Sequence, residues 1–203
     1  ADQTVADDAH GAEGGAIAHA VRVYASAPSR RGGRSGDGLR WGSMTQEYED
    51  GYAVTVARTD GGWVVREFED DFTDLSTSIK AVRALRSEGA AFAILNVEED
   101  YLVVVRPGPS RTRLLLSDAT MAVDDDFAAD ILDEAGYEVP DIDPDELDDV
   151  EAWAEGDFAI FEDLGLSEER LSILLDDDAE PRDLAETIAE DLGFLDELTD
   201  AVG

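Results

Sequence analysis

Two pairs of β-forming runs, each joined by a short turn, place the strongest constraint on the fold of this chain. The first turn contains two glycines, which supply the positive φ that a tight hairpin turn requires. The second pair is almost continuously apolar, as expected of strands that are covered on both faces. The runs are Tyr52–Arg58 with Trp63–Glu69, and Phe92–Val97 with Tyr101–Arg106. Consecutive strands joined by short turns predict an antiparallel sheet.

Helical periodicity separates and follows these hairpins. Leu75, Ile79, Val82 and Leu85 fall on one helical face, and Asp74 and Gly89 are the expected N-terminal and C-terminal caps. A fifth strand is expected in Arg111–Ala119, and a second helix follows in residues 124–136. The order β-β-α-β-β-β-α predicts an α+β fold, with a mostly antiparallel five-stranded sheet and helices on one face.

Composition changes along the chain predict four parts. Residues 1–43 lack apolar periodicity, so we expect an extension that is disordered or absent from the native protein, with translation starting at Met44. Residues 44–136 form the sheet domain, and residues 137–157 form an acidic linker in which "DELDDVEAWA" is a possible short helix. Residues 158–203 form a small all-helical subdomain. There, Ser167 is expected to cap one helix and Pro181 to open the next.

The charge is strongly negative and unevenly distributed. Fifty acidic and fifteen basic residues give a net charge of −35. Residues 124–203 hold thirty-one acids and only Arg170 and Arg182, a net of −29. Such a half repels phosphate backbones, so no direct nucleic-acid binding is expected, and a basic protein surface is the natural partner. Solubility alone, or adaptation to high salt, remains an alternative explanation of the charge.

The sequence offers no catalytic constellation. It has no cysteine, and its two histidines precede Met44, so the common nucleophile–histidine arrangements are unavailable after that residue. Asp141–Ala152 imitates a calcium loop, but Glu146 stands where the loop needs glycine and Ala152 where it needs glutamate. We therefore expect no enzyme activity, no cofactor and no metal. The absence of a long apolar run or secretory signal predicts a cytoplasmic protein that does not enter a membrane.

A group of aromatic and acidic residues in and after the linker is the predicted partner-binding site. The aromatic side chains would be anchors and the carboxylates an acidic rim, because aromatic residues are favoured at binding hot spots. The alternative is that the aromatic residues pack the subdomain onto the sheet. The predicted residues are Trp153, Phe158, Phe161, Asp141, Asp143, Asp145, Asp148 and Asp149.

The layout of segments resembles the tRNA adenosine deaminase-associated proteins of actinobacteria. The resemblance rests on "YAVTVARTDGGWVVREFEDDFTDLSTSIKAVRALRSEGAAFAILNVEEDYLVVVRPG", on "LLLSDATMAV", on the acidic linker and on "EDLGLSEERLSILL" with "LAETIAEDLGF". It covers about Tyr48 to Gly203. The chain is not the deaminase, which needs H-x-E and P-C-x-x-C to hold its zinc.

The resemblance implies an accessory role. The family has no known active site, so no residue of this chain can be assigned a catalytic role from it. The expectation is an acidic protein that binds a basic partner, with the tRNA adenosine deaminase as the leading candidate, and that could act as a nucleic-acid mimic. An acidic chaperone or adaptor for another client is the alternative. A carboxylate- or metal-dependent enzyme is the third class, and it would require a pocket with a buried pair of acids.

Overall fold

A computed structural model describes residues 51–176 and 179–203. The predicted start at Met44 and the predicted extension 1–43 lie outside the described residues.

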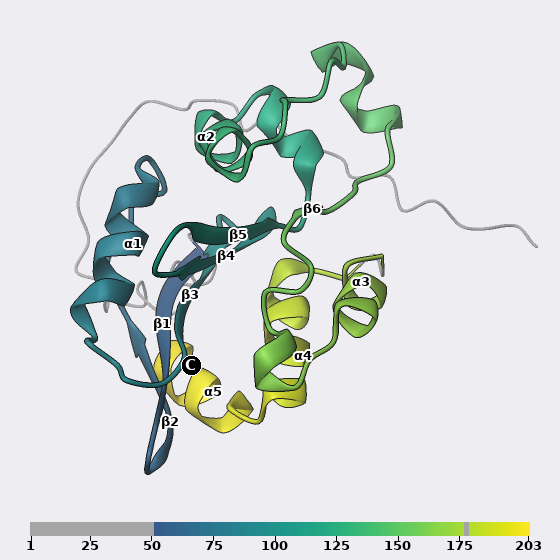
Figure 1. The fold of residues 1–203 in the computed structure, drawn as a ribbon. Coiled ribbons are helices and arrows are strands. Elements are labelled where there is room, and N and C mark those ends of the chain that lie inside the picture. Colours follow the sequence, from purple (N-terminus) through teal and green to yellow (C-terminus); the bar gives the residue numbers. More distant parts are fainter. Residues whose placement is uncertain (1–50, 177–178) are drawn as a thin grey trace, which may run out of the picture. The chain divides into compact units, whose positions relative to one another are not determined.

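A six-stranded sheet forms the centre of the fold (Figure 1). Its order is β2-β1-β3-β4-β5-β6, and every neighbouring pair is antiparallel. The strands are β1 (Gly51–Thr59), β2 (Gly62–Glu67), β3 (Ala91–Val97), β4 (Tyr101–Pro107), β5 (Thr112–Leu116) and β6 (Glu155–Gly156). The predicted α+β class is confirmed. The predicted count of five strands is corrected to six, because β6 has only two residues and its sequence shows no alternation.

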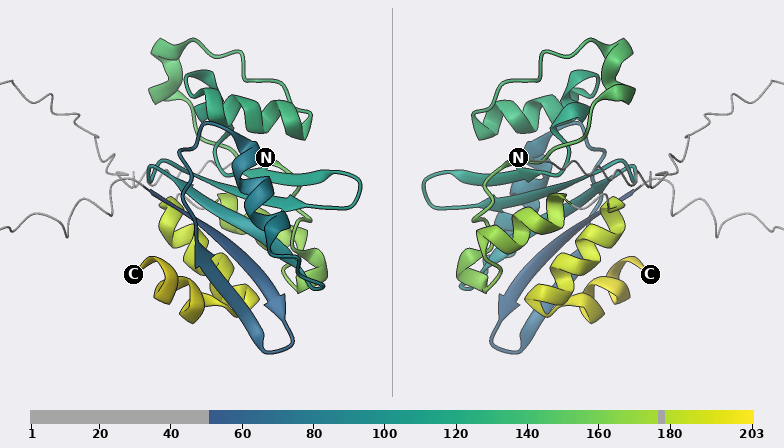
Figure 2. Two further views of the ribbon diagram at one scale, coloured as in Figure 1. Left: turned by 90° about the vertical axis from the view of Figure 1, so that its left-hand side faces the viewer. Right: turned by 90° about the vertical axis from the view of Figure 1, so that its right-hand side faces the viewer.

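Two helices cover one face of the sheet (Figure 2). These are α1 (Leu75–Ala84) and α2 (Asp126–Ala135), and they share a core with strand residues such as Ala53, Leu95 and Val103. The Asp74 side chain accepts a hydrogen bond from the Ser76 backbone N–H at 2.8 Å, which confirms the predicted N-cap. The predicted cap at Gly89 is wrong, since α1 ends at Ala84 and Leu85 is its C-cap.

The C-terminal helices cover the opposite face. They are α3 (Glu168–Asp176), α4 (Pro181–Leu192) and α5 (Leu195–Val202), with Pro181 in the first turn of α4 as expected. Their apolar residues share a second core with Val54, Val56 and other residues of the strands. Alternation along each strand divides the side chains between the two cores, so β3 and β4 are buried on both faces as predicted.

Short 3₁₀ helices complete the chain. They are η1 (Ala119–Val123), η2 (Pro144–Asp149) and η3 (Glu162–Leu164). The short helix predicted in "DELDDVEAWA" therefore corresponds only to η2. In the described part of the chain, no helix is long and apolar enough to cross a membrane.

Four aromatic rings form the centre of the core beneath the C-terminal helices. The ring of Phe92 lies 5.0 Å from that of Phe161 and 5.9 Å from that of Phe194, measured between centroids. Trp63 lies 5.4 Å from Phe194 and donates its Nε1–H to the carbonyl of Leu192. These contacts join the sheet, the turn before η3 and the end of α4 into one packed unit.

The same core contains two polar side chains that lack hydrogen-bond partners. Tyr52 and Asn96 lie directly opposite each other in β1 and β3. Among the described residues, neither the Tyr52 hydroxyl nor either polar atom of the Asn96 amide has a partner. Burial raises the pKa of the Tyr52 hydroxyl, and the Arg182 guanidinium lies 5.3 Å from the centre of its ring. Buried polar groups without partners reduce stability.

Candidate partner-binding surface

Residues 137–155, called here the acidic segment, connect α2 to β6. The segment contains nine acidic and no basic residues. The Tyr137 hydroxyl donates to the Gly156 carbonyl at 3.2 Å, and the Ala119 N–H donates to the Trp153 carbonyl at 2.7 Å. These bonds tie both ends of the acidic segment to the folded unit, so its charges are presented from an anchored loop.

Large apolar side chains are exposed mainly within the acidic segment. Four of the six in the described part of the chain belong to it, and the other two are Val64 and Ile173. Trp153 is 38 % exposed, although aromatic side chains of this size are usually buried. Exposed apolar residues with acidic neighbours are suited to a protein partner with a basic surface. The four residues are Tyr137, Val139, Val150 and Trp153.

The predicted carboxylates lie in or beside η2. Asp141, Asp143, Asp145 and Asp149 are exposed. The Asp143 side chain accepts the Asp145 N–H at 3.1 Å and so caps η2. The backbone of Asp148 belongs to η2 as well, and its side chain lies outside the description. Asp141, Asp143, Asp145 and Asp149 are therefore exposed on η2 and on the residues that precede it.

The three predicted aromatic residues do not come together at one surface. Phe161 is 0 % exposed and lies in the aromatic core beneath the C-terminal helices. Phe158 is half-buried and packs against the same core, whereas Trp153 is exposed. Phe161 and Phe158 therefore pack the C-terminal helices onto the sheet, as the alternative interpretation predicted. Of the three aromatic residues, Trp153 is the one whose ring is exposed to a partner. Sequence reasoning missed the exposed residues Tyr137, Val139 and Val150. The feature that could have revealed them is that each is an isolated apolar residue among acidic ones.

Arginines from β4 and β5 fix the chain where it leaves the acidic segment. Arg113 makes a two-pronged contact with Asp157, Nε to Oδ2 at 2.7 Å and Nη2 to Oδ1 at 3.1 Å. Arg106 pairs with Asp163 and donates to the Ile160 carbonyl. The hydrogen bond from each arginine lowers the pKa of the carboxyl that it contacts, Asp157 or Asp163. Two-pronged pairs of this kind combine strength with a defined geometry.

The Arg113–Asp157 pair predicts a pH-dependent effect of one substitution. The folded-state pKa of Asp157 lies below its ordinary value of 3.8, so the pair stabilises the fold fully above that value. That contribution is lost as the pH falls through the lowered folded-state pKa. We expect Asp157→Asn to reduce the free energy of unfolding at neutral pH by about 1 kcal/mol or less, because the pair is partly exposed.

Urea unfolding of wild type and D157N at about pH 7 and about pH 3 measures this effect. The difference between the two proteins should shrink at the lower pH. Asp60→Asn changes the charge equally at an exposed turn and should show little difference at either pH. A D157N deficit that stays constant across this range would contradict the assignment.

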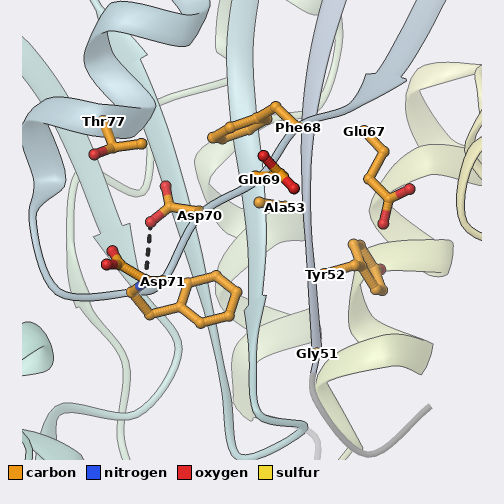
Figure 3. Close-up of a pocket in the computed structure, with 10 residues that line it drawn as sticks. Gly51, Tyr52, Ala53, Glu67, Phe68, Glu69, Asp70, Asp71 and Thr77 are labelled. Atoms are coloured by element: carbon orange, nitrogen blue, oxygen red, sulfur yellow. Dashed lines mark hydrogen bonds between the residues drawn. The ribbon is translucent and has the colours of Figure 1, made fainter. Parts of the chain in front are cut away.

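A separate acidic pocket lies beside the start of β1 and the end of β2 (Figure 3). It has a volume of about 720 Å³, and Glu67, Glu69, Asp70 and Asp71 contribute to its lining. Asp70 is half-buried and accepts hydrogen bonds from the Phe72 N–H and the Ser78 hydroxyl, while the other three acids are exposed. In the described residues, no group of three or more acidic or histidine side chains is arranged to hold a metal ion. The pocket therefore does not supply the buried carboxylate pair that acid–base catalysis would require.

The fold defines an α+β protein with a six-stranded antiparallel sheet, and its most distinctive surface is the anchored acidic segment with four exposed apolar side chains. The chain belongs to the Rv3753c-like tRNA adenosine deaminase-associated protein family, whose match covers residues 51–195. It is 41 % identical over 152 residues to Protein Rv3753c of Mycobacterium tuberculosis (strain ATCC 25618 / H37Rv). That alignment covers 74 % of this chain and 86 % of the relative. No solved structure matches the chain.

Proposed function

We propose that this chain is a non-catalytic accessory protein that binds a basic surface of a protein partner, the tRNA adenosine deaminase. The family description supplies the association with that enzyme. The observation that carries the binding mode is the anchored acidic segment, with its nine acids and four exposed apolar side chains. The absence of cysteine, and of histidine after Met44, supports a role without catalysis.

The proposed binding has two physical components. The net charge of −35 attracts a basic surface over a distance set by the Debye length, about 10 Å at 0.1 M salt. Trp153 and its apolar neighbours then supply the short-range contact, since exposed aromatic residues contribute strongly to interfaces. If the acids occupy the place of tRNA phosphates on the partner, this protein is also a nucleic-acid mimic.

A titration of the purified deaminase tests the proposal. Asp141, Asp143, Asp145 and Asp149 are changed together to asparagine, which keeps the capping ability of residue 143 while removing four charges. We expect the Kd at low salt to rise about tenfold, and the difference from wild type to shrink as salt is added. Isothermal titration calorimetry at two or more salt concentrations gives both values.

The matched control removes four exposed charges from the C-terminal helices. These substitutions are Glu168→Gln, Glu190→Gln, Asp196→Asn and Asp200→Asn. The control should weaken binding much less than the variant of the acidic segment. Equal weakening by both variants would show that only total charge matters, and no binding by wild type at low salt would overturn the proposal. Competition by tRNA for the same complex would support the mimicry.

A further inference from the structure

One pocket is free of acids in its lining although the chain as a whole is strongly acidic. It has a volume of about 370 Å³ and lies between the connection from α1 to β3 and the turn from β4 to β5. Four arginines contribute to its lining, and no aspartate or glutamate does. The arginines are Arg83, Arg86, Arg106 and Arg113. The lining of this pocket is positively charged, whereas the chain as a whole is negatively charged. A positively charged lining is suited to binding an anion.

Both walls of this pocket are held in place by close backbone contacts. A Cβ on Gly89 would lie 2.5 Å from the Arg58 carbonyl oxygen, and one on Gly108 would lie 2.7 Å from that of Arg111. Only glycine allows these approaches. The Arg58 N–H donates to the Ala90 carbonyl at 2.8 Å, and the Gly108 N–H donates to the Arg111 carbonyl at 2.9 Å. The pocket is therefore formed before any ligand arrives.

Two of the four arginines are available to a ligand. Arg106 and Arg113 already pair with Asp163 and Asp157. Arg83 and Arg86 are exposed, and neither forms an ion pair with any residue of the described chain. Arg83 also lies in the last turn of α1, where a cation is favoured by the helix dipole. The helix dipole does not explain the presence of a cation at Arg86, because this residue lies beyond the end of α1. Its backbone is in the left-handed region, with a φ of 48°.

We infer that this pocket binds the phosphate group of a small organic ligand of about mononucleotide size, with Arg83 and Arg86 as its main contacts. Guanidinium groups match phosphate oxygens in a two-pronged geometry. Val82, Ala91 and Pro107 supply apolar surface for the organic part, and the volume lies within the range of small-molecule sites, about 300–1,000 Å³. The net charge of −35 disfavours a long polyanion more than a ligand with one phosphate. The inference does not depend on the proposed association with the deaminase.

An NMR titration of the full chain with 5′-AMP tests the inference. Amide signals of residues 83–91 and 107–109 should shift, and adenosine without phosphate should leave them unchanged. Arg86→Gln and Arg83→Gln should each raise the Kd about tenfold, as loss of a charged hydrogen bond predicts. Lys80→Gln is the matched control, because Lys80 lies on α1 outside the pocket and the charge change is the same.

The possible outcomes distinguish a phosphate in a free nucleotide from a phosphate in RNA, and they also show whether the inference fails. Tighter binding of tRNA than of 5′-AMP at the same residues would overturn the inference, because the ligand would then be a nucleotide within RNA instead of a small molecule. Binding of 5′-AMP alone would identify a free nucleotide. The inference is overturned if 5′-AMP shifts no signal in these residues, or if R83Q and R86Q bind as K80Q does while their amide spectra show an intact fold.

Discussion

Replacing Phe161 with alanine is expected to lower the free energy of unfolding by about 3–5 kcal/mol. Phe161 has no exposed surface, and its ring contacts that of Phe92 at 5.0 Å in the core beneath the C-terminal helices. Removing the ring leaves a cavity between the sheet and its helical cover, and surrounding residues collapse only partly into such spaces. A domain with ordinary stability of about 5–15 kcal/mol would lose a large share of it.

Chemical unfolding followed by tryptophan fluorescence measures the free energy of unfolding of each protein. Trp63 reports on this core because its ring lies within it. Trp153→Ala is the matched comparison, because Trp153 is exposed and its loss should cost about 1 kcal/mol or less. Together the two variants show which of these two aromatic residues stabilises the fold by packing. An F161A protein as stable as wild type would contradict the placement of Phe161 in the core.

Replacing Asn96 with leucine is expected to raise the free energy of unfolding by about 1–3 kcal/mol. Asn96 is fully buried, and both polar atoms of its amide lack partners among the described residues. The amide gives up its hydrogen bonds to water on folding and receives none in return from the described residues. Leucine has the same branched skeleton of heavy atoms, although its methyl groups are larger than the amide oxygen and nitrogen, and it carries no such cost. The neighbouring Leu102 and Ile94 already provide an apolar environment.

Thermal and urea unfolding of N96L measure the gain. Ser78→Ala is a suitable contrast, because the Ser78 hydroxyl is also buried but donates to Asp70 at 2.6 Å, so its removal should reduce stability. The two substitutions should therefore shift the unfolding midpoint in opposite directions. A loss of stability in N96L would show that the amide of Asn96 is hydrogen-bonded in solution.

The strands were predictable from sequence where local chemistry decides the structure. Asp60-Gly61 and Glu98-Glu99-Asp100 form the turns of two hairpins, and the runs beside them have the expected alternation or continuous apolar character. β6 was not predictable, because its two residues pair with Leu115 and Leu116 through long-range contacts that no local pattern encodes. The capping role assigned to Gly89 failed for a related reason, since that glycine accommodates the Arg58 carbonyl of a distant strand.

The arrangement of the C-terminal helices was less accessible to sequence reasoning. An amphipathic helix reveals its apolar side but not the surface that this side covers. The helix expected to open at Pro181 is α4, and the structure adds that its residues Leu184, Ile188 and Leu192 share a core with the sheet.

The candidate site was predictable only in part, because exposure depends on neighbours that are remote in sequence. Trp153 and Phe161 are aromatic residues in the same acidic stretch, eight positions apart. One is exposed and the other is fully buried. Tyr137, Val139 and Val150 resemble ordinary linker residues in the sequence, and only the structure shows that their side chains are exposed.

The division of the sheet between two cores has a consequence for folding during synthesis on the ribosome. Chains emerge from the N-terminal end, so α1 and α2 can pack on their face of the sheet while translation continues. The other face, which includes Val54, Ile94 and Val104, has no cover until residues 158–203 have left the exit tunnel. The nine negative charges of residues 137–155 emerge just before that cover, and charge of one sign opposes association with other chains while the second apolar surface is still open to the solvent.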